Sequence, residues 1–326
     1  MEGNQLADLL PGPATPWAGC QHEAFLYEGA DDFLRGTLEF ILDAVAAEEP
    51  VLVVLDSDKI KTLRSELRAT SAKVLFADMA DVGTNPARII PAWQDFLDEH
   101  AGPDAQVRGI GEPICSGRSP AELAECQRHE ALLNLAFADA SFWLLCPYDV
   151  VTLDTTVIDE AVRTHPTVRQ RGVERPSWSY PGSGAFATPD TSPLSDVPDG
   201  VPVLTFGPGD IGEVRQFVFR HAAGTGLGID RVADLVLAAD EISTNSLRHG
   251  GGLGTIGVWT EGDEAVCEIR DRGRMPEPLA GRRRPSVDGN DGRGLWLANQ
   301  LCDLVQIRAI ETGGVVRLRV RCGATS

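Results

Sequence analysis

The stretch LVLAADEISTNSLRHG, residues 235–250, decides the fold of the C-terminal third of this 326-residue chain. Apolar residues recur along it at helical spacing and predict an amphipathic helix from about Asp230 to His249. Glu241, Asn245 and His249 are spaced four residues apart and therefore share a different face of that helix. A carboxylate one turn from a carboxamide suits Mg²⁺-phosphate chemistry, because the amide oxygen is a hard metal ligand and the carboxylate can activate a hydroxyl.

Two glycine motifs follow this helix in the sequence. EIRDRGR, residues 268–274, ends a predicted strand with Asp271 and places Gly273 two residues later. An acidic side chain there can accept an adenine amino group, and the glycine lets a base approach the backbone. GNDGRGLWL, residues 289–297, places Gly292 and Gly294 at a predicted helix start, where free backbone amides bind phosphates.

The elements around these motifs predict an α/β sandwich with helices on one face of a mixed sheet. In chain order we expect a strand, two helices, two strands, a polar loop, a helix and a closing hairpin. Their ranges are 201–206, 208–222, 230–249, 255–262, 265–271, 272–290, 295–303, 304–311 and 315–322.

The ordered set of these motifs resembles the GHKL ATPase superfamily, with residues 235–250 similar to its N-box. Within it, residues 203–322 look closest to the anti-sigma factor kinases, which phosphorylate a serine or threonine of an anti-anti-sigma partner. The resemblance implies that ATP and Mg²⁺ are cofactors, that Glu241 is the catalytic base and that Asn245 holds the metal. It also implies that Asp271 and Gly273 hold adenine, and that the second glycine box lines the phosphates. This box comprises Gly292, Arg293, Gly294 and Leu295.

Arg282, Arg283 and Arg284 lie between the two glycine boxes, where the superfamily carries a mobile ATP lid. They could neutralise triphosphate charge or grip an acidic partner, or they could belong to a solvated loop. The acidic N-terminal part of this chain is itself a candidate docking partner for them.

From about residue 21 to 167, apolar runs alternate with amphipathic stretches, which predicts a parallel sheet covered by helices on both faces. Strands are expected at 51–56, 74–78, 106–110 and 142–149, and helices around 31–47, 59–69, 86–100 and 119–139.

Three segments of this N-terminal region, HEAFLYE (22–28), EEPVLVVLD (48–56) and IGEPICSGRSPAELAECQRHEALLN (110–134), resemble the MEDS sensory domain. The resemblance implies a RecA-like fold, and the chain has no GxxxxGK[ST] segment that could form a phosphate-binding loop. It also implies sensing of an unnamed small molecule or protein. His22, Tyr27, Glu112 and Glu125 are the candidate pocket residues, and core or capping roles for them stay open.

Composition divides the chain and limits its partners. We expect an N-terminal tail at 1–20, a sensory domain at 21–170, a flexible Pro/Ser/Gly-rich linker at 171–202 and the ATPase domain at 203–322. A net charge of −19 argues against nucleic-acid binding. Neither a membrane-spanning stretch nor a signal peptide is evident, so we expect a cytoplasmic protein.

Several functions remain open at this point. The leading one is a serine/threonine kinase that phosphorylates an anti-anti-sigma (STAS-type) protein, sequesters a sigma factor, or does both under sensory control. A module that binds ATP and sequesters a sigma factor without phosphotransfer is one alternative. A histidine kinase using His129 beside Glu130 is another, although no dimerisation hairpin precedes the ATPase region. A homodimer is possible, and Cys115, Cys126 and His129 could form a partial metal site.

Overall fold

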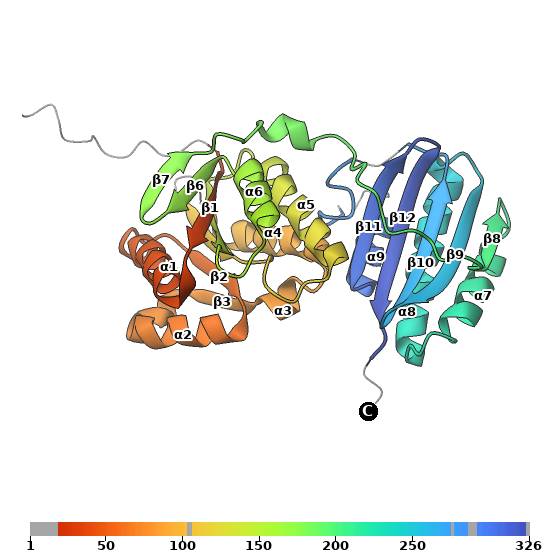
Figure 1. Cartoon of the computed structure of the whole chain (residues 1–326), viewed down its shortest axis with the longest axis horizontal. Coiled ribbons are helices and arrows are strands. Elements are labelled where there is room, and N and C mark those ends of the chain that lie inside the picture. The colour runs from red at the N-terminus through yellow and green to blue at the C-terminus, as the bar shows by residue number, and fades with distance from the viewer. Residues whose placement is uncertain (1–18, 103–105, 275–276, 286–291, 324–326) are drawn as a thin grey trace, which may run out of the picture.

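Two separate sheets organise the chain (Figure 1). The computed structural model describes residues 19–102, 106–274, 277–285 and 292–323. Within these ranges, no helix combines the length and apolar character needed to cross a bilayer.

The N-terminal sheet has seven strands in the order β3-β2-β4-β5-β1-β6-β7, and every pairing except β6 with β7 is parallel. Its strands are β1 (Gln21–Tyr27), β2 (Val51–Leu55), β3 (Leu75–Asp78), β4 (Val107–Gly111), β5 (Phe142–Asp149), β6 (Thr167–Gln170) and β7 (Val173–Pro176). The main helices are α1 (Gly29–Ala46), α2 (Ser57–Leu67), α4 (Ile89–His100), α5 (Pro120–Ala136) and α6 (Thr155–Thr164), with a short α3 (Met79–Val82). Short 3-10 helices lie at Arg68–Lys73, Pro86–Arg88 and Ser183–Phe186.

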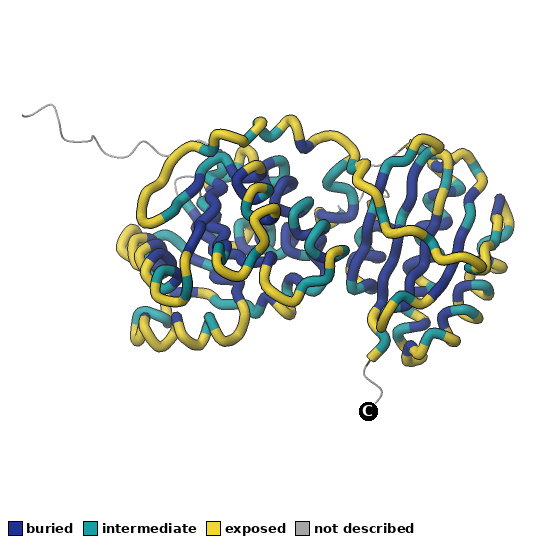
Figure 2. Tube along the Cα trace, viewed as in Figure 1, coloured by how far each residue is buried: buried dark blue, intermediate teal, exposed yellow. Residues whose placement is uncertain are grey.

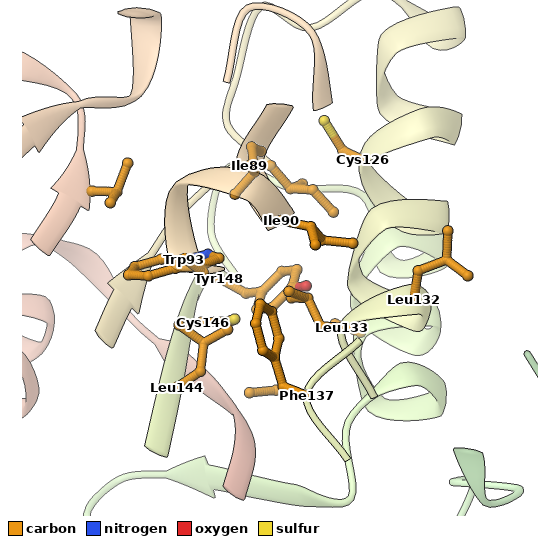
Figure 3. Packing of buried hydrophobic residues seen from close by; sticks show 14 of the residues in the cluster. Ile89, Ile90, Trp93, Cys126, Leu132, Leu133, Phe137, Leu144, Cys146 and Tyr148 are labelled. Carbon is orange, nitrogen blue, oxygen red and sulfur yellow. The ribbon is translucent and has the colours of Figure 1, made fainter. Parts of the chain in front are cut away.

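Apolar side chains cover both faces of this sheet, as the alternating sequence pattern predicts. One face packs on α1 and α2 through residues such as Phe40 and Leu63. The other packs on α4, α5 and α6, and Figure 3 shows Trp93 and Phe137 in this core. The rings of both residues contact that of Phe142. The expectation of a mostly parallel sheet covered by helices is confirmed.

The strand β1 lies between β5 and β6, although it was not among the predicted strands. Its first residues include His22 and Glu23, two polar side chains that are each 1% exposed. They shorten the apolar run by which the four predicted strands of this domain are recognised. The strands β6 and β7, which have no apolar run, were not predicted either. Glu23 is matched by Arg169, whose Nε lies 2.7 Å from it, and by the indole N–H of Trp143.

The C-terminal sheet has the order β11-β12-β10-β9-β8, with helices on one face. Its elements are β8 (Val203–Phe206), α7 (Ile211–Ala222), α8 (Ile229–His249), β9 (Gly254–Glu261), β10 (Glu264–Asp271), α9 (Arg293–Leu301), β11 (Leu304–Ile310) and β12 (Gly313–Arg321). The expectation of a mixed sheet is wrong, because all four described pairings are antiparallel. The connections explain this arrangement. The strands β9 and β10 form a hairpin, and so do β11 and β12. The chain between β8 and β9 forms two helices and returns antiparallel to β8.

The segment that joins the domains crosses the other face of this sheet (Figures 1 and 2). This face carries charged side chains that include Glu268, Arg317 and Arg319. Arg317 is fully buried there, with Glu268 at 2.6 Å and the carbonyl of Ser195 at 2.9 Å. The N–H of Ala309 in β11 donates to the carbonyl of Asp190 at 2.7 Å. The segment is therefore seated on the sheet by specific bonds, which differs from the flexible linker expected from its composition.

Arg317→Ala tests the importance of this anchor. It would remove the buried cation beside Glu268 and leave this carboxylate only its pair with the half-exposed Arg270, so we expect a loss of ~3 kcal/mol in the free energy of unfolding, the lower end of the range for a broken buried pair. Urea titration followed by circular dichroism measures it. Arg215→Ala, which breaks the exposed pair with Asp240, is the control and should cost much less. Equal losses in the two variants would contradict the anchoring role.

Candidate nucleotide site

The polar face of α8 presents the first group of predicted site residues. The opposite face of this helix is buried in the core through residues such as Leu235, Ala239 and Ile242. Glu241 and Asn245 are partly buried one turn apart, whereas His249 is exposed at the helix end. Their spacing follows directly from the helix, as the sequence predicts.

The N-terminus of α9 lies directly against these two side chains. A Cβ added to Gly294 would come within 2.7 Å of Asn245 Nδ2 and 3.0 Å of Glu241 Oε2. Gly292 precedes the helix with a φ of +82°, in the left-handed region that favours glycine. The GxG motif therefore sets a helix N-terminus, with its free amides, beside a carboxylate and a carboxamide.

The end of β10 completes the group from a second side. Asp271 accepts a hydrogen bond from the Ser246 hydroxyl at 2.6 Å and another from the Gly273 N–H at 2.8 Å. A Cβ on Gly273 would meet the Cα of Gly250 and the carbonyl oxygen of His249, each at 2.6 Å. This close packing holds the Asp271 carboxylate beside α8. Ser246 was not predicted, although it follows Asn245 directly in the sequence.

The remaining predicted residues of the second glycine box differ in exposure. Arg293 is exposed, and the Leu295 side chain packs in the core. What Leu295 can offer a ligand is therefore its backbone rather than its side chain. Residues 275–276 and 286–291 of the predicted lid lie outside the described residues.

This arrangement fits Mg²⁺ and a nucleotide. The side-chain amide of Asn245 lies directly beside Gly294. The oxygen of such an amide is a ligand that Mg²⁺ accepts. The helix N-terminus supplies amides for phosphates, and the Asp271 carboxylate supplies an acceptor for a base.

The four candidate sensory residues lie in three different places. Tyr27 and Glu112 meet at the carboxyl ends of β1 and β4, where the Tyr27 hydroxyl donates to Glu112 at 3.0 Å. Lys59, which was not predicted, contacts both of them. Burial raises the pKa of Glu112, and the Lys59 ammonium opposes that shift. His22 lies elsewhere, bonded to Glu130.

Glu125, the fourth candidate, joins the two domains. Its carboxylate pairs with Arg282 at 2.9 Å and with Arg308 at 2.7 Å, and all three side chains are buried. Arg284 also reaches the N-terminal domain, at 2.7 Å from Asp95. The arginines between the glycine boxes therefore contact the acidic N-terminal domain, as one of the two sequence interpretations holds.

A second contact joins the N-terminal domain to the far end of α9. Arg88 donates to the carbonyls of Asn299, Gln300 and Cys302, at 2.8, 2.6 and 3.3 Å. The Asn85 amide donates to two of the same carbonyls. A cation and an amide thus satisfy the open carbonyls at the C-terminus of this helix.

Cys115, Cys126 and His129, which the sequence offered as a possible partial metal site, are not brought together as a ligand group among the described residues. Cys115 is exposed, whereas Cys126 is buried and donates to the carbonyl of Pro113. His129 is 1% exposed, which leaves its ring out of reach of a phosphate donor in this state.

Gly273→Ala tests the packing beside Asp271. The new Cβ would meet backbone atoms that cannot move aside, so we expect the free energy of unfolding to fall by ~1–3 kcal/mol. Gly184→Ala, where a Cβ meets nothing within 4 Å, is the matched control and should stay within ~0.5 kcal/mol of the parent. Thermal unfolding measures both variants, and an unchanged midpoint for Gly273→Ala would refute the close packing.

Two family models match the chain, each in a different region. Residues 21–166 match the family model of the MEDS domain (MEthanogen/methylotroph, DcmR Sensory domain), and residues 204–320 match that of the histidine kinase-like ATPase domain. No curated protein matches the chain. A crystal structure of the RsbU and RsbW domains of Rv1364c from Mycobacterium tuberculosis is 21% identical over 37% of this chain and 32% of that chain, with a TM-score of 0.28. The chain spans about a third of that protein. The two family models thus match separate regions of the chain, the MEDS model the N-terminal one and the histidine kinase-like ATPase model the C-terminal one.

Proposed function

We propose that the C-terminal domain binds Mg²⁺-ATP and transfers its terminal phosphoryl group to a serine or threonine of an anti-anti-sigma (STAS-type) protein. One observation carries this proposal: Glu241 and Asn245 lie one turn apart on α8, and both adjoin Gly294 at the N-terminus of α9. Phosphoryl transfer depends on positioning and charge stabilisation, and this site brings together groups suited to both.

Each residue has a separate part in the proposed reaction. Asn245 would hold Mg²⁺ through its amide oxygen, and the metal would neutralise charge on the phosphates. The α9 amides from Gly292 to Leu295 would bind phosphate oxygens, and Asp271 with Gly273 would hold adenine. Glu241 would accept the proton of the attacking hydroxyl, because its carboxylate adjoins Gly294, where the phosphates would bind.

The link to a sigma-factor pathway rests on the resemblance of residues 235–250, 271–273 and 292–295 to the anti-sigma factor kinases. The chain would phosphorylate an anti-anti-sigma protein, sequester a sigma factor, or do both in the cytoplasm. A non-catalytic binder would need ATP but no base. Replacement of Glu241 therefore distinguishes the two functions, because only phosphotransfer needs its carboxylate.

Glu241→Gln keeps the shape of the site and removes the base. We expect Mg²⁺-ATP binding within about twofold of the parent and phosphotransfer reduced by on the order of 10²–10⁴. Asn245→Ala should instead lose the Mg²⁺ dependence of binding. Transfer of radiolabel from ATP to candidate STAS-type proteins measures the reaction, and calorimetry measures binding. Full transfer by Glu241→Gln would remove it as the base, and absence of transfer by the parent would favour sequestration.

We further propose that the MEDS domain regulates the ATPase domain through α9 and the loop before it. Arg88 and Asn85 hold the C-terminus of α9, and Glu125 holds Arg282. A ligand that moves the N-terminal domain would thereby shift the helix whose other end adjoins Glu241 and Asn245. Coupling of this kind requires only that the ligand prefer one of two arrangements.

Arg88→Ala removes three hydrogen bonds to α9 and leaves the nucleotide site itself unchanged. We expect Mg²⁺-ATP affinity to change by ~2–30-fold, the range typical of coupling through a contact network. Arg163→Ala, which breaks contacts with Glu160 and with the ring of Phe186 rather than with α9, serves as the control. Identical ATP affinities in the two variants would contradict regulation through this contact.

A further inference from the structure

Four side chains with metal-binding atoms converge inside the N-terminal domain, away from the nucleotide site. They are His22 on β1, Glu130 on α5, Cys146 on β5 and His165 at the end of α6. Their ligand atoms all lie within 4.8 Å of one another, and every residue is at most 1% exposed. We call these four residues the His-Glu-Cys cluster.

The spacing within the His-Glu-Cys cluster suits a tetrahedral ion. His22 Nε2 lies 3.1 Å from Glu130 Oε2 and 3.4 Å from Cys146 Sγ. His165 Nε2 lies 3.3 Å from the same Glu130 oxygen. Ligands bound to zinc at ~2.0–2.3 Å in a tetrahedron are separated by about 3.3–3.7 Å. Small side-chain movements would therefore complete the coordination.

Hydrogen bonding alone leaves this cluster incompletely satisfied. Glu130 Oε1 and His165 Nε2 are buried without a hydrogen-bond partner. In the part of the chain that the structure describes, the ion pairs of Glu130 involve only the two histidines, with no lysine or arginine. A buried carboxylate without a cation is costly. One divalent cation with a carboxylate, a thiolate and two neutral imidazoles would give a neutral centre.

The outer nitrogens of both histidines are already held in the orientation that metal ligands require. His165 Nδ1 lies 2.7 Å from the carbonyl of Ala161, so it donates there and leaves its Nε2 lone pair facing the cluster. His22 Nδ1 lies 3.3 Å from Asn134 Oδ1, and the Asn134 amide is fixed by donating to the carbonyl of Thr164 at 2.8 Å. Such second partners set the tautomer and ring position of metal-bound histidines.

Apolar side chains enclose the site. Figure 3 shows Cys146 among Leu133, Leu144, Phe137 and Tyr148, all of which belong to one buried cluster. Four protein donors and a closed apolar surround are typical of a structural zinc site rather than one that binds substrate. Sulfur and imidazole donors favour zinc over Mg²⁺ or Ca²⁺.

From these observations we infer that His22, Glu130, Cys146 and His165 form a closed site for a zinc-type divalent cation. The ion would tie β1 and β5 to α5 and α6. The proposal concerns the N-terminal domain and is independent of the nucleotide chemistry.

Metal analysis of the full chain, expressed without a histidine tag in zinc-supplemented medium, tests the inference. Mass spectrometry should find about one zinc per chain, since a complete donor set binds one ion. Cys146→Ser and His165→Gln should each lower the zinc content severalfold. Cys126→Ser and His129→Gln change a buried cysteine and a buried histidine of the same domain outside the cluster, and they should keep it.

Cobalt replacement supplies a readout that does not depend on any variant folding. The parent chain, stripped with a chelator and reloaded with Co²⁺, should develop the visible bands of a tetrahedral site and a thiolate charge-transfer band, and its melting temperature should rise. A parent chain that holds no zinc and develops no such bands would overturn the inference. Equal zinc contents in Cys146→Ser and Cys126→Ser would overturn it as well.

Discussion

Helix α9 contacts the proposed nucleotide site at its N-terminus and the N-terminal domain at its C-terminus. The proposed coupling between the two domains depends on these two contacts. At its N-terminus, Gly294 adjoins Glu241 and Asn245 so closely that a methyl group would not fit without movement. At its C-terminus, Arg88 of the N-terminal domain donates hydrogen bonds to three backbone carbonyls. A helix is stiff along its axis, so a displacement at one end reaches the other. The N-terminal domain thereby contacts the helix whose other end borders the proposed phosphate site.

The joining segment contributes a second restraint on the domains. Its composition suggests a free chain, yet Arg317 binds the Ser195 carbonyl and β11 binds the Asp190 carbonyl. A buried arginine needs hydrogen-bond acceptors. The backbone carbonyls of the joining segment provide them, although the segment does not pair with the sheet as a strand. The polar face of the sheet is therefore covered by a segment whose sequence shows few apolar residues. The joining segment is hydrogen-bonded to the sheet along part of its length. This arrangement does not suit regulation by an N-terminal domain that moves freely on a flexible linker.

Much of the architecture could be predicted from local patterns. Apolar runs identified the buried strands that pack on both faces, and the four-residue spacing of Glu241 and Asn245 follows from helix geometry alone. Other features depend on partners that are distant in the sequence. The strand β1 was missed because His22 and Glu23 are polar, and only the fold supplies Glu130 and Arg169 to match them. The His-Glu-Cys cluster escaped notice because its members lie on four elements with no regular spacing. The one metal pattern that the sequence offered was Cys126 and His129, three residues apart, and these two do not join a ligand group among the described residues. The direction of the C-terminal strands likewise depends on connections that periodicity does not reveal.

The central claim is that α8, the end of β10 and the start of α9 form an adenine nucleotide site. Calorimetric titration of the full chain and of Asp271→Asn with Mg²⁺-ATP and Mg²⁺-GTP tests it most directly. We expect the parent to bind ATP with a Kd of ~1 μM, about −8 kcal/mol, and to prefer ATP over GTP. Asp271→Asn should lose that preference, because its amide presents one acceptor oxygen where the carboxylate presents two. Absence of saturable ATP binding by the parent, or an ATP preference unchanged in Asp271→Asn, would contradict the account.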